Sequence, residues 1–491
     1  MAFDLDRRSM LAAAGLSLLA GGAQAQAPQG SQTQQGAAPA PAQEKGRPVL
    51  IRGSTVVTMD PALDVLATGD VLVRDGRIAA MGAKLEAPDA EVIDAKGAIL
   101  APGFINSHIH LAQAILRGLA GDATLDQYFK VVVARYTRHI RPEDLAASDY
   151  AAALEQLNGG TTTVFDWCRE ALTPAHADAI VDAMQRSGIR AFFGYGVTGP
   201  AQGGAAIRAD VERLRKGPLA SDDARVRLAL ALRGPDSSPM DEAEDDFRFA
   251  RSLGLLNQFH VGVLLYADRR RRGVADLIAK GVIGPSAILV HANDLDPDEY
   301  ALVAGAGAAI VTTPEVEMMM GHGQPATGRA RGAGLKPGLG VDVVTGVGGD
   351  MFSQMRTMVS AQRLADNLAA AQARTPLPAV TLTARQALEA ATIDGARLLS
   401  VEREIGSIVP GKRADLILVR ADRLGTAPLN DPIGTLVFQA NPGDVDAVMV
   451  DGAWIKRNGL LVGRDPARAV ANLETQARAL YARAAQPKTP G

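Results

Sequence analysis

The feature that most constrains the fold is a regular alternation of short apolar runs with helical patterns through the middle of the chain. Eight apolar runs of strand length are separated by amphipathic stretches, for example 142–158, 174–187, 241–253 and 350–372. Strands that alternate with helices are typical of a parallel sheet, and eight such units close into a barrel. A doubly wound sheet also alternates, but no GxGxxG turn follows the first run. We therefore predict a (β/α)8 TIM barrel over residues 102–401. The eight runs are GFINSHIH, TTTVFDW, IRAFFGYGV, VRLALALRG, LLNQFHVGV, AILVHAND, AAIVTTPE and PGLGVDVV.

The segments on either side of this region have a different texture. Residues 47–101 and 402–463 contain β-branched runs that are cut by Gly, Asp and Pro turns, with the tight-turn signals RDGR and VDGAW. Because strands from opposite ends of a chain can pair, we predict that the two segments form one small β-sandwich domain. Residues 464–491 are predicted to be a C-terminal helix and tail.

The first residues differ from the rest of the chain in composition. Arg7 and Arg8 precede a short apolar stretch, and the small residues 23–25 (Ala-Gln-Ala) follow it. This is the pattern of a twin-arginine signal peptide, which we predict over residues 1–25; a chance Arg-Arg pair before a helix is the alternative. Residues 26–46 are rich in Pro, Gln, Ala and Gly and are predicted to be a disordered linker. We expect a periplasmic or secreted protein that has no membrane part after signal removal.

Composition narrows the class of partner. The net charge is −3, whereas a nucleic-acid-binding protein is expected to carry a basic patch, so no nucleic-acid partner is expected. Cys168 is the only cysteine, so no internal disulfide can form. We expect a small-molecule substrate, and the sequence leaves the oligomeric state open, homo-oligomers included.

Polar residues at the ends of the apolar runs carry the chemical signal. His108 and His110 end the first run, and residues i and i+2 of a strand face the same side. Both imidazoles should therefore point into the barrel near its carboxyl-end mouth, where they can chelate one cation. His260, His291 and Asp342 end the fifth, sixth and eighth runs. Each alone is more often a core or turn residue, but the five converge on one rim as a set of three histidines and one carboxylate, with one histidine to spare. Two other histidines, His139 and His176, lie in helix or loop contexts and are predicted to be at the surface.

Longer signatures accompany these residues: APGFINSHIHL, GGTTTVFDW, ILVHAND, GLGVDVVTGVGGDMFSQMR and GSIVPGKRADLILV. With them the chain resembles the amidohydrolase superfamily over residues 47–463, in the branch of the cytosine, guanine and S-adenosylhomocysteine deaminases and triazine chlorohydrolases. The resemblance implies the barrel with its composite β-sandwich, and one divalent metal ion, zinc or alternatively iron. It implies His108, His110, His260 and Asp342 as the metal ligands, with His291 beside the bound water. The fourth run ends in LRGPD, which has no lysine to bridge a second metal.

The ligand set suggests a mechanism. The metal lowers the pKa of water, Asp342 takes the water proton, and His291 contacts the attacking oxygen or polarises the electrophilic carbon. We predict a metal-dependent, deaminase-like hydrolase that acts on a non-peptide C–N bond of a cyclic amidine, an N-heterocycle or an amide. Two alternatives are the hydrolytic removal of halide or alkylamine from a heteroaromatic ring, and a metal-binding protein without turnover.

One expected acid is missing. Deaminases of this branch usually carry HxxE after the fifth strand, and here Val263 stands where the glutamate is expected. In TPEVEMMMGHG, Pro314 is expected to end the seventh strand, which would place Glu315 and Glu317 in a loop at the catalytic face. Only one of two neighbouring carboxylates is expected to point inward. Our hypothesis is that Glu317 supplies the missing acid or binds a cationic or amidine-like substrate; a structural loop carboxylate is the alternative.

Further residues on the predicted rim are weaker candidates. Met318 to Met320 are expected to fill core gaps or to line a substrate wall. Asp350 is most simply a helix N-cap. Asp166 and Trp167 end the second run on the same rim. The candidates for substrate contact are Gln113, Arg117, Glu315, His322 and Asp350.

Overall fold

The computed structural model describes residues 47–197, 204–263 and 271–486. The predicted signal peptide, the predicted linker and the last five residues of the predicted tail lie outside the described residues. Within the described ranges, no helix combines the length and the apolar character needed to cross a membrane.

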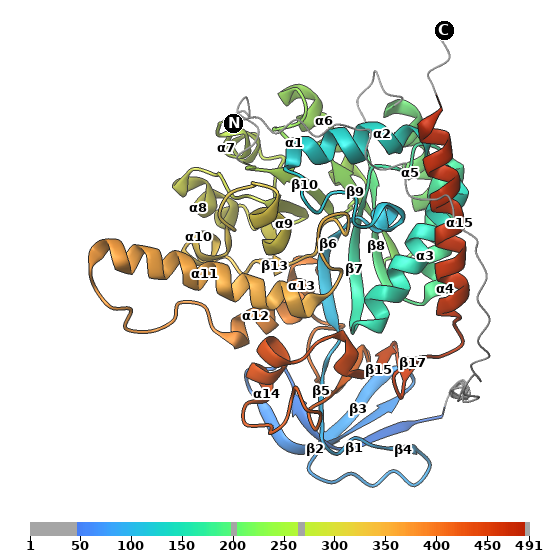
Figure 1. Ribbon diagram of the computed structural model, residues 1–491, viewed down its shortest axis with the longest axis vertical. Helices are drawn as coiled ribbons and strands as arrows, with labels where there is room; N and C mark the ends of the chain where they lie inside the picture. The colour runs from blue at the N-terminus through green and yellow to red at the C-terminus, as the bar shows by residue number, and fades with distance from the viewer. Residues whose placement is uncertain (1–46, 198–203, 264–270, 487–491) are drawn as a thin grey trace, which may run out of the picture. The chain divides into compact units, whose positions relative to one another are not determined.

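The central part of the chain is a parallel barrel, as predicted (Figure 1). Its eight strands follow one another in sequence order, and an isolated parallel bridge between Ile109 and Asp342 joins the last strand segment to the first. The last strand is shorter than predicted and ends at Leu339, and Asp342 beyond it has a φ of 70°, in the left-handed region. The strands are β6 (Phe104–Ile109), β7 (Thr161–Cys168), β8 (Arg190–Gly196), β9 (Val226–Leu232), β10 (Asn257–Val261), β11 (Ala287–His291), β12 (Ala309–Thr312) and β13 (Gly338–Leu339).

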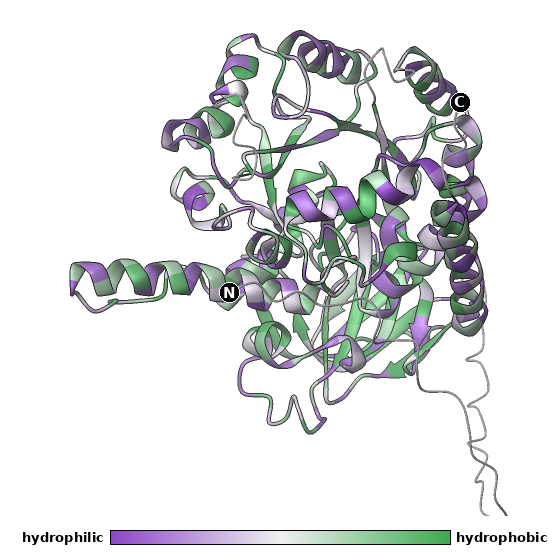
Figure 2. Cartoon of the chain, turned by 45° about the horizontal axis from the view of Figure 1, so that its top comes forward, coloured by the Kyte–Doolittle hydropathy of each residue, from purple (hydrophilic) through white to green (hydrophobic). Residues whose placement is uncertain are grey.

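Helices follow most of the strands and cover the outside of the barrel (Figure 1). Helix α4 (Pro174–Ser187) shows why they form: Ala177, Ile180, Val181 and Met184 recur at helical spacing and are buried. Hydrophobic colour gathers in the strands, while the outer helices carry hydrophilic stretches (Figure 2). The other longer helices are α3 (Pro142–Asn158), α5 (Gly204–Lys216), α6 (Met240–Ser252), α7 (Gly273–Ala279), α8 (Pro297–Gly305), α11 (Met351–Ala373), α12 (Ala384–Ala390) and α15 (Pro466–Ala485). The short ones are η1 (Leu111–Leu116), α1 (Leu125–Tyr128), η2 (Phe129–Val133), α2 (Ala134–Tyr136), η3 (Thr137–His139), α9 (Pro314–Met319), α10 (Thr327–Gly332), α13 (Ile393–Leu398), α14 (Pro432–Gly434), η5 (Thr435–Gln439) and η6 (Pro442–Asp444).

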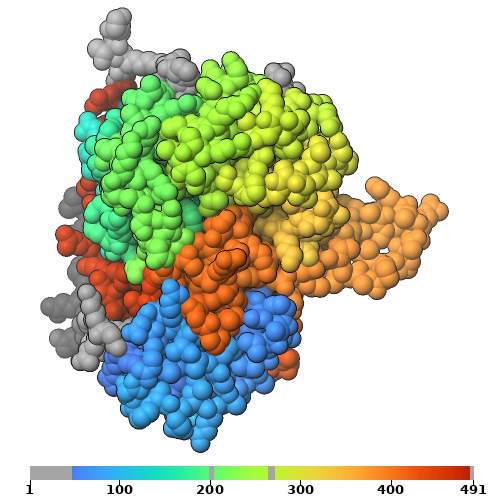
Figure 3. Space-filling model, turned by 180° about the vertical axis from the view of Figure 1, so that it is seen from behind, coloured from blue at the N-terminus to red at the C-terminus, as the bar shows by residue number. Residues whose placement is uncertain are grey.

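Strands from both chain ends form a second, mixed sheet, as predicted (Figures 1 and 3). The antiparallel pairing of β5 with β14 joins the two ends, and one apolar cluster contains Val49 and Leu100 together with Leu418 and Trp454. Hydrogen bonds connect all nine strands into one continuous sheet, where the sequence suggested a sandwich. The strands are β1 (Val49–Val57), β2 (Val65–Arg74), β3 (Arg77–Gly82), β4 (Glu91–Asp94), β5 (Ala98–Pro102), β14 (Leu416–Arg420), β15 (Val445–Val450), β16 (Ala453–Arg457) and β17 (Leu460–Leu461).

A buried ion-pair network ties the sheet to the amino ends of the barrel strands. Arg190, the first residue of β8, donates to Asp415 over 2.8 and 3.0 Å and to Asp451 over 2.5 Å. Asp415 precedes β14 and Asp451 follows β15. Because the sheet covers this end of the barrel, the carboxyl ends of the strands stay free to form a site.

Candidate metal centre

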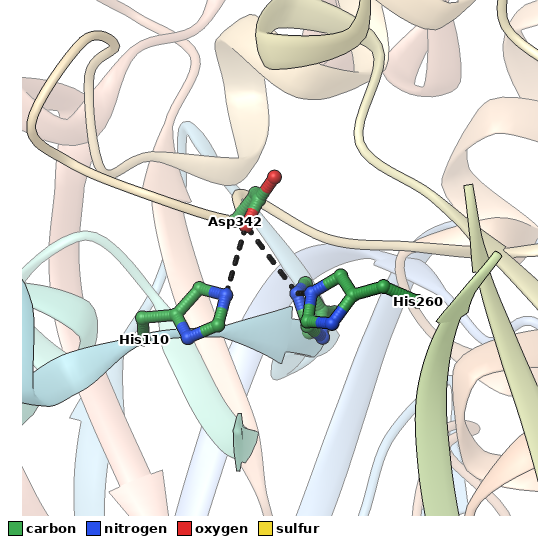
Figure 4. A group of neighbouring side chains, drawn as sticks. His110, His260 and Asp342 are labelled. Atoms are coloured by element: carbon green, nitrogen blue, oxygen red, sulfur yellow. Dashed lines mark hydrogen bonds and ion pairs between the residues drawn. The ribbon is translucent and has the colours of Figure 1, made fainter. Parts of the chain in front are cut away.

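Four predicted metal ligands come together at the carboxyl ends of the barrel strands. His108 lies in β6, His110 directly follows it, His260 lies in β10, and Asp342 follows β13. Their ligand atoms all lie within 4.8 Å of one another. Asp342 Oδ1 is 3.1 Å from His110 Nε2 and 3.4 Å from His108 Nε2, and the Nε2 atoms of His108 and His260 are 3.3 Å apart. Figure 4 shows His110 and His260 turned toward the Asp342 carboxylate.

This arrangement fits one divalent cation. Four ligands at about 2.1 Å from a tetrahedral zinc ion lie about 3.4 Å apart, close to the separations observed here. His108 Nδ1 is 2.9 Å from Gln258 Oε1, a contact that orients the ring with Nε2 toward the group. Burial lowers the pKa of His110 and of His260, so both imidazoles are neutral and can offer a lone pair.

Asp342, the carboxylate of the group, has a shifted pKa and a strained backbone angle. Burial alone would raise the pKa of Asp342, but hydrogen bonds from His108 and His110 outweigh it and hold that pKa well below its usual range. The backbone of Asp342 is fixed at its φ of 70° by hydrogen bonds from its N–H to His108 O and from His110 N–H to its own carbonyl, each 3.0 Å. His291 also has a positive φ, 72°. Strained residues of this kind concentrate at functional sites.

His291 connects the metal centre to Glu317. His291 Nε2 lies 3.7 Å from Asp342 Oδ2, while Nδ1 lies 3.2 Å from Glu317 Oε1. Glu317 Oε1 also accepts the Thr313 N–H over 2.8 Å. Burial raises the pKa of Glu317 to about 7 and lowers the pKa of His291 to about 4. Glu317 therefore contacts the site through His291.

The segment around Glu317 is a helix and not the predicted loop. Helix α9 begins at Pro314, and residues i and i+2 of a helix point about 200° apart. Glu317 consequently turns inward, while Glu315 turns toward α11 and accepts a 2.6 Å hydrogen bond from Gln354. Glu315 does not line the cavity, which corrects its assignment to the substrate. The methionines divide in a similar way: Met318 and Met319 are about half exposed and Met320 is buried.

A cavity of about 610 Å³ opens beside the metal centre. His110, His260, His291 and Asp342 contribute to one part of its wall, together with Trp167. This size lies within the range of small-molecule sites. The wall also contains Leu125, Tyr128, Phe129, Arg169, Arg233, Glu242, Val263, Met320 and His322.

His322 reaches the site, as the sequence suggested. Its ring centroid lies 4.7 Å from that of His291, and its side chain is almost fully buried. Neither ring nitrogen of His322 has a hydrogen-bond partner among the described residues. A buried imidazole with two unpartnered nitrogens beside a cavity is available to a bound molecule.

Three other predicted substrate contacts lie elsewhere. After His110 the chain turns into η1, which buries Gln113 away from the cavity, where it accepts from the Tyr128 hydroxyl over 2.8 Å. Arg117 is exposed and pairs with Glu155 over 2.6 and 2.9 Å. Asp350 caps α11 by accepting the Ser353 N–H. None of the three lines the cavity, which corrects their assignment to the substrate, whereas the N-cap role predicted for Asp350 is confirmed.

Other polar residues of the rim have internal partners. Asp166 is buried and accepts the Leu111 N–H over 2.8 Å, and Trp167 donates its Nε1–H to Gln258 O.

The two remaining histidines lie outside the rim. His176 was predicted to be at the surface but is buried, with Nδ1 2.7 Å from Thr173 Oγ1, because it lies on the inward-facing side of helix α4. His139 is partly exposed.

Sequence reasoning missed three charged groups of the cavity wall, Arg169, Arg233 and Glu242. Arg169 follows β7 and Arg233 follows β9, so the rule that found the histidines, a polar residue after an apolar strand, could have found both. Arg233 forms an ion pair with Glu242 and another, 2.7 Å long, with Asp246. Val263 lines the cavity where related deaminases were expected to carry an acid.

Known proteins resemble the chain over most of its length. The model of the amidohydrolase family matches residues 99–455. The 5-methylthioadenosine/S-adenosylhomocysteine deaminase of Symbiobacterium thermophilum is 30% identical over 419 residues, which cover 82% of this chain and 92% of that protein. The 5'-deoxyadenosine deaminase of Methanothermobacter thermautotrophicus is 27% identical over 420 residues, which cover 83% of this chain and 94% of that protein.

Two solved structures illustrate the structural likeness. An adenosine deaminase from Xanthomonas campestris with bound zinc superposes with a TM-score of 0.79 at 27% identity, covering 88% of this chain and 98% of that chain. The zinc complex of an atrazine chlorohydrolase from Arthrobacter aurescens TC1 gives a TM-score of 0.77 at 24% identity, covering 87% and 100%. The second likeness shows a shared fold.

Proposed function

Since the chain belongs to the amidohydrolase family and is a metal-dependent hydrolase, we propose that it deaminates an amino-substituted N-heterocycle, with adenine nucleosides as the first candidates. The family match confirms the resemblance drawn from the sequence. The observation that carries the proposal is the buried group of three imidazoles and one carboxylate beside an aromatic-walled cavity. Relatives and a structural neighbour that are named as deaminases of adenosine derivatives support the choice of substrate class.

The proposed site holds one divalent metal ion, zinc first and iron as the alternative. His108, His110 and His260 would bind it through Nε2, and Asp342 through Oδ1. A metal ion there would lower the pKa of a water molecule and so supply a hydroxide nucleophile near neutral pH.

The chain's own residues move the protons. Glu317 Oε1 accepts from His291 Nδ1–H, which leaves His291 Nε2 facing Asp342 Oδ2. Asp342 takes the proton of the attacking water at Oδ2, and His291 Nε2 relays a proton to the departing amine. The balanced reaction consumes one water and exchanges the exocyclic amino group for oxygen, with release of ammonia.

Glu317 acts in this scheme as a positioning residue. It is fully buried, makes its contact with Nδ1 of His291, and so sets the tautomer of that imidazole. His322 is the group that can contact a ring nitrogen of the substrate where Val263 offers no hydrogen bond, because both of its ring nitrogens are unpartnered within the described structure.

A panel of substrates tests the proposal. Zinc-loaded protein is offered adenosine, 5'-deoxyadenosine, a methylthioadenosine and aminotriazines, and ammonia release is measured together with metal content. Ammonia release that disappears on chelation and returns with zinc supports deamination. Metal-loaded protein that releases no ammonia from any of these heterocycles contradicts it.

Loss of halide or alkylamine from a heteroaromatic ring is the second candidate. The observation that favours it is Val263, since a halide leaves without the proton that an amine requires. Release of chloride from a chlorotriazine, without ammonia from the aminopurines, would select this reaction over deamination.

We also propose export by the twin-arginine route, based on Arg7, Arg8 and the small residues 23–25. Replacing both arginines with lysine should retain the protein in the cytoplasmic fraction, whereas the unchanged protein should appear in the periplasm or medium. Equal distribution of the two proteins contradicts the proposal.

A further inference from the structure

The cavity wall contains a cation that lacks a carboxylate partner within the described part of the chain. Arg169 lines the cavity just past the carboxyl end of β7. Its guanidinium carbon lies 5.2 Å from the centre of the Trp167 ring and 5.6 Å from that of the Phe129 ring. Its Nε is buried without a hydrogen-bond partner. The two rings therefore hold the guanidinium in place by stacking, and its hydrogen-bond donors remain available.

The second arginine of the wall makes a useful contrast. Arg233 pairs with Glu242 and with Asp246, and Arg208 also pairs with Asp246. The charge of Arg233 is thus balanced inside the protein. A buried donor that stays unpaired costs free energy, so the unpartnered Nε of Arg169 is best explained by a ligand that completes it.

The position of Arg169 relates it to the metal centre. The centre of the Trp167 ring lies 4.6 Å from that of the His260 ring and 5.2 Å from the Arg169 guanidinium carbon. A molecule that presents its reacting carbon to the metal centre therefore needs to extend only about one indole width along Trp167 to reach Arg169.

The charges around Arg169 indicate which anion fits. Glu170, the next residue, is buried. A phosphate dianion would add two negative charges close to the Glu170 carboxyl group, whereas a carboxylate adds one. A carboxylate can accept two parallel hydrogen bonds from the planar guanidinium fork.

We propose that Arg169 forms an anion subsite in the cavity and that the substrate of the proposed deaminase carries a carboxylate about one ring away from its reacting carbon. This inference rests on the proposed function. The subsite selects substrates: a carboxylate-bearing heterocycle is bound through Arg169, and an uncharged analogue loses that contact.

The test compares a matched pair of compounds, adenosine 5'-carboxylic acid and its 5'-carboxamide, on the zinc-loaded protein. We expect a kcat/KM about ten- to a hundredfold higher for the acid. Arg169→Met, which keeps the apolar stem and removes the charge, should abolish this preference through a rise in KM for the acid. Arg169→Lys should keep part of the preference. Arg117→Met, an exposed arginine outside the cavity, is the matched control and should behave like the unchanged protein.

The outcomes separate the inference from the proposed function. Equal kcat/KM for acid and amide, or a preference that survives in Arg169→Met, overturns the subsite and leaves deamination standing. A higher kcat/KM for adenosine 5'-monophosphate than for the carboxylic acid overturns the carboxylate assignment.

If neither compound of the pair reacts, Kd values measured by calorimetry decide. Tighter binding of the acid that is lost in Arg169→Met supports the subsite, and equal Kd values for acid and amide overturn it. If Arg169→Met fails to fold, the comparison of acid with amide in the unchanged protein and in Arg169→Lys decides.

Discussion

Two groups of buried charge lie at opposite ends of the same barrel and are built on different principles. At the amino end, Arg190 is flanked by Asp415 and Asp451, and Asp451 also pairs with Arg225 and Arg413 over 3.1 Å each. Each of these charges faces an opposite charge, and only one nitrogen of Arg190, Nη1, lacks a partner in the described structure. This group holds the sheet against the barrel.

At the carboxyl end, several buried polar atoms have no hydrogen-bond partner among the described residues. Within the described residues, His110 Nδ1, Glu317 Oε2 and both ring nitrogens of His322 have no hydrogen-bond partner. His291 and Asp342 also have strained backbone angles. In a group that stabilises the fold, the donors and acceptors pair with one another. In a group that binds a ligand, some donors and acceptors remain unpaired within the protein.

The largest expected effect comes from breaking the group at the carboxyl end. His108→Ala removes one of the four proposed ligands, and we expect a loss of at least about 10⁴-fold in kcat together with loss of bound metal. Metal analysis and kinetics measure both, and circular dichroism should show an unchanged fold. A His108→Ala protein that keeps its metal would remove this residue from the ligand set.

Breaking the group at the amino end should act on stability instead. Asp415→Ala leaves Arg190 buried with one partner fewer, and we expect a loss of about 3–5 kcal/mol in the free energy of unfolding. Denaturant titration measures it. Activity per folded molecule should stay within about twofold, because Asp415 lies at the far end of the strands. A large drop in kcat at unchanged stability would contradict the division between the two groups.

A smaller effect on kcat is expected for Glu317, which contacts His291 and is not a proposed metal ligand. Glu317→Gln should lower kcat by up to about a hundredfold, because the amide no longer sets the charge and tautomer of His291. Metal content should be unchanged. The pH profile of kcat distinguishes this role from a purely structural one, since it should shift in the variant, and an unchanged kcat would exclude Glu317 from proton transfer.

The same substitution also tests how the protonation of Glu317 changes the free energy of unfolding with pH. Burial raises the pKa of Glu317 from the ordinary 4.5 to about 7, so the folded protein holds this proton more tightly than the unfolded chain. The resulting stability is fully present below about pH 4.5 and is lost as the pH rises through about 7. Relative to the unchanged protein, Glu317→Gln should therefore gain about 3 kcal/mol between about pH 4 and about pH 8. Urea titrations of both proteins in the same metal state measure the difference, and a gain that does not depend on pH would show that Glu317 does not titrate there.

Much of the metal centre could be predicted from the sequence because its geometry follows from local rules. Residues i and i+2 of β6 share a face, and the carboxyl ends of parallel strands meet at one rim. These two rules bring His108, His110, His260 and Asp342 together without knowledge of any long-range contact. The composite sheet followed from β-rich texture at both chain ends, although its continuity through β5 and β14 was not predicted.

The surroundings of the metal centre depended on the tertiary structure. That Glu317 faces inward and Glu315 outward depends on the helix that starts at Pro314, and a helix and a loop are both compatible with that short stretch. That Arg169 forms no ion pair with any described residue depends on every segment that packs around it. The chemical groups that meet at the rim could be predicted from the sequence, since strand geometry is local. Which of their neighbours are already paired and which remain available depends on the tertiary structure, because pairing is a property of the whole packed environment.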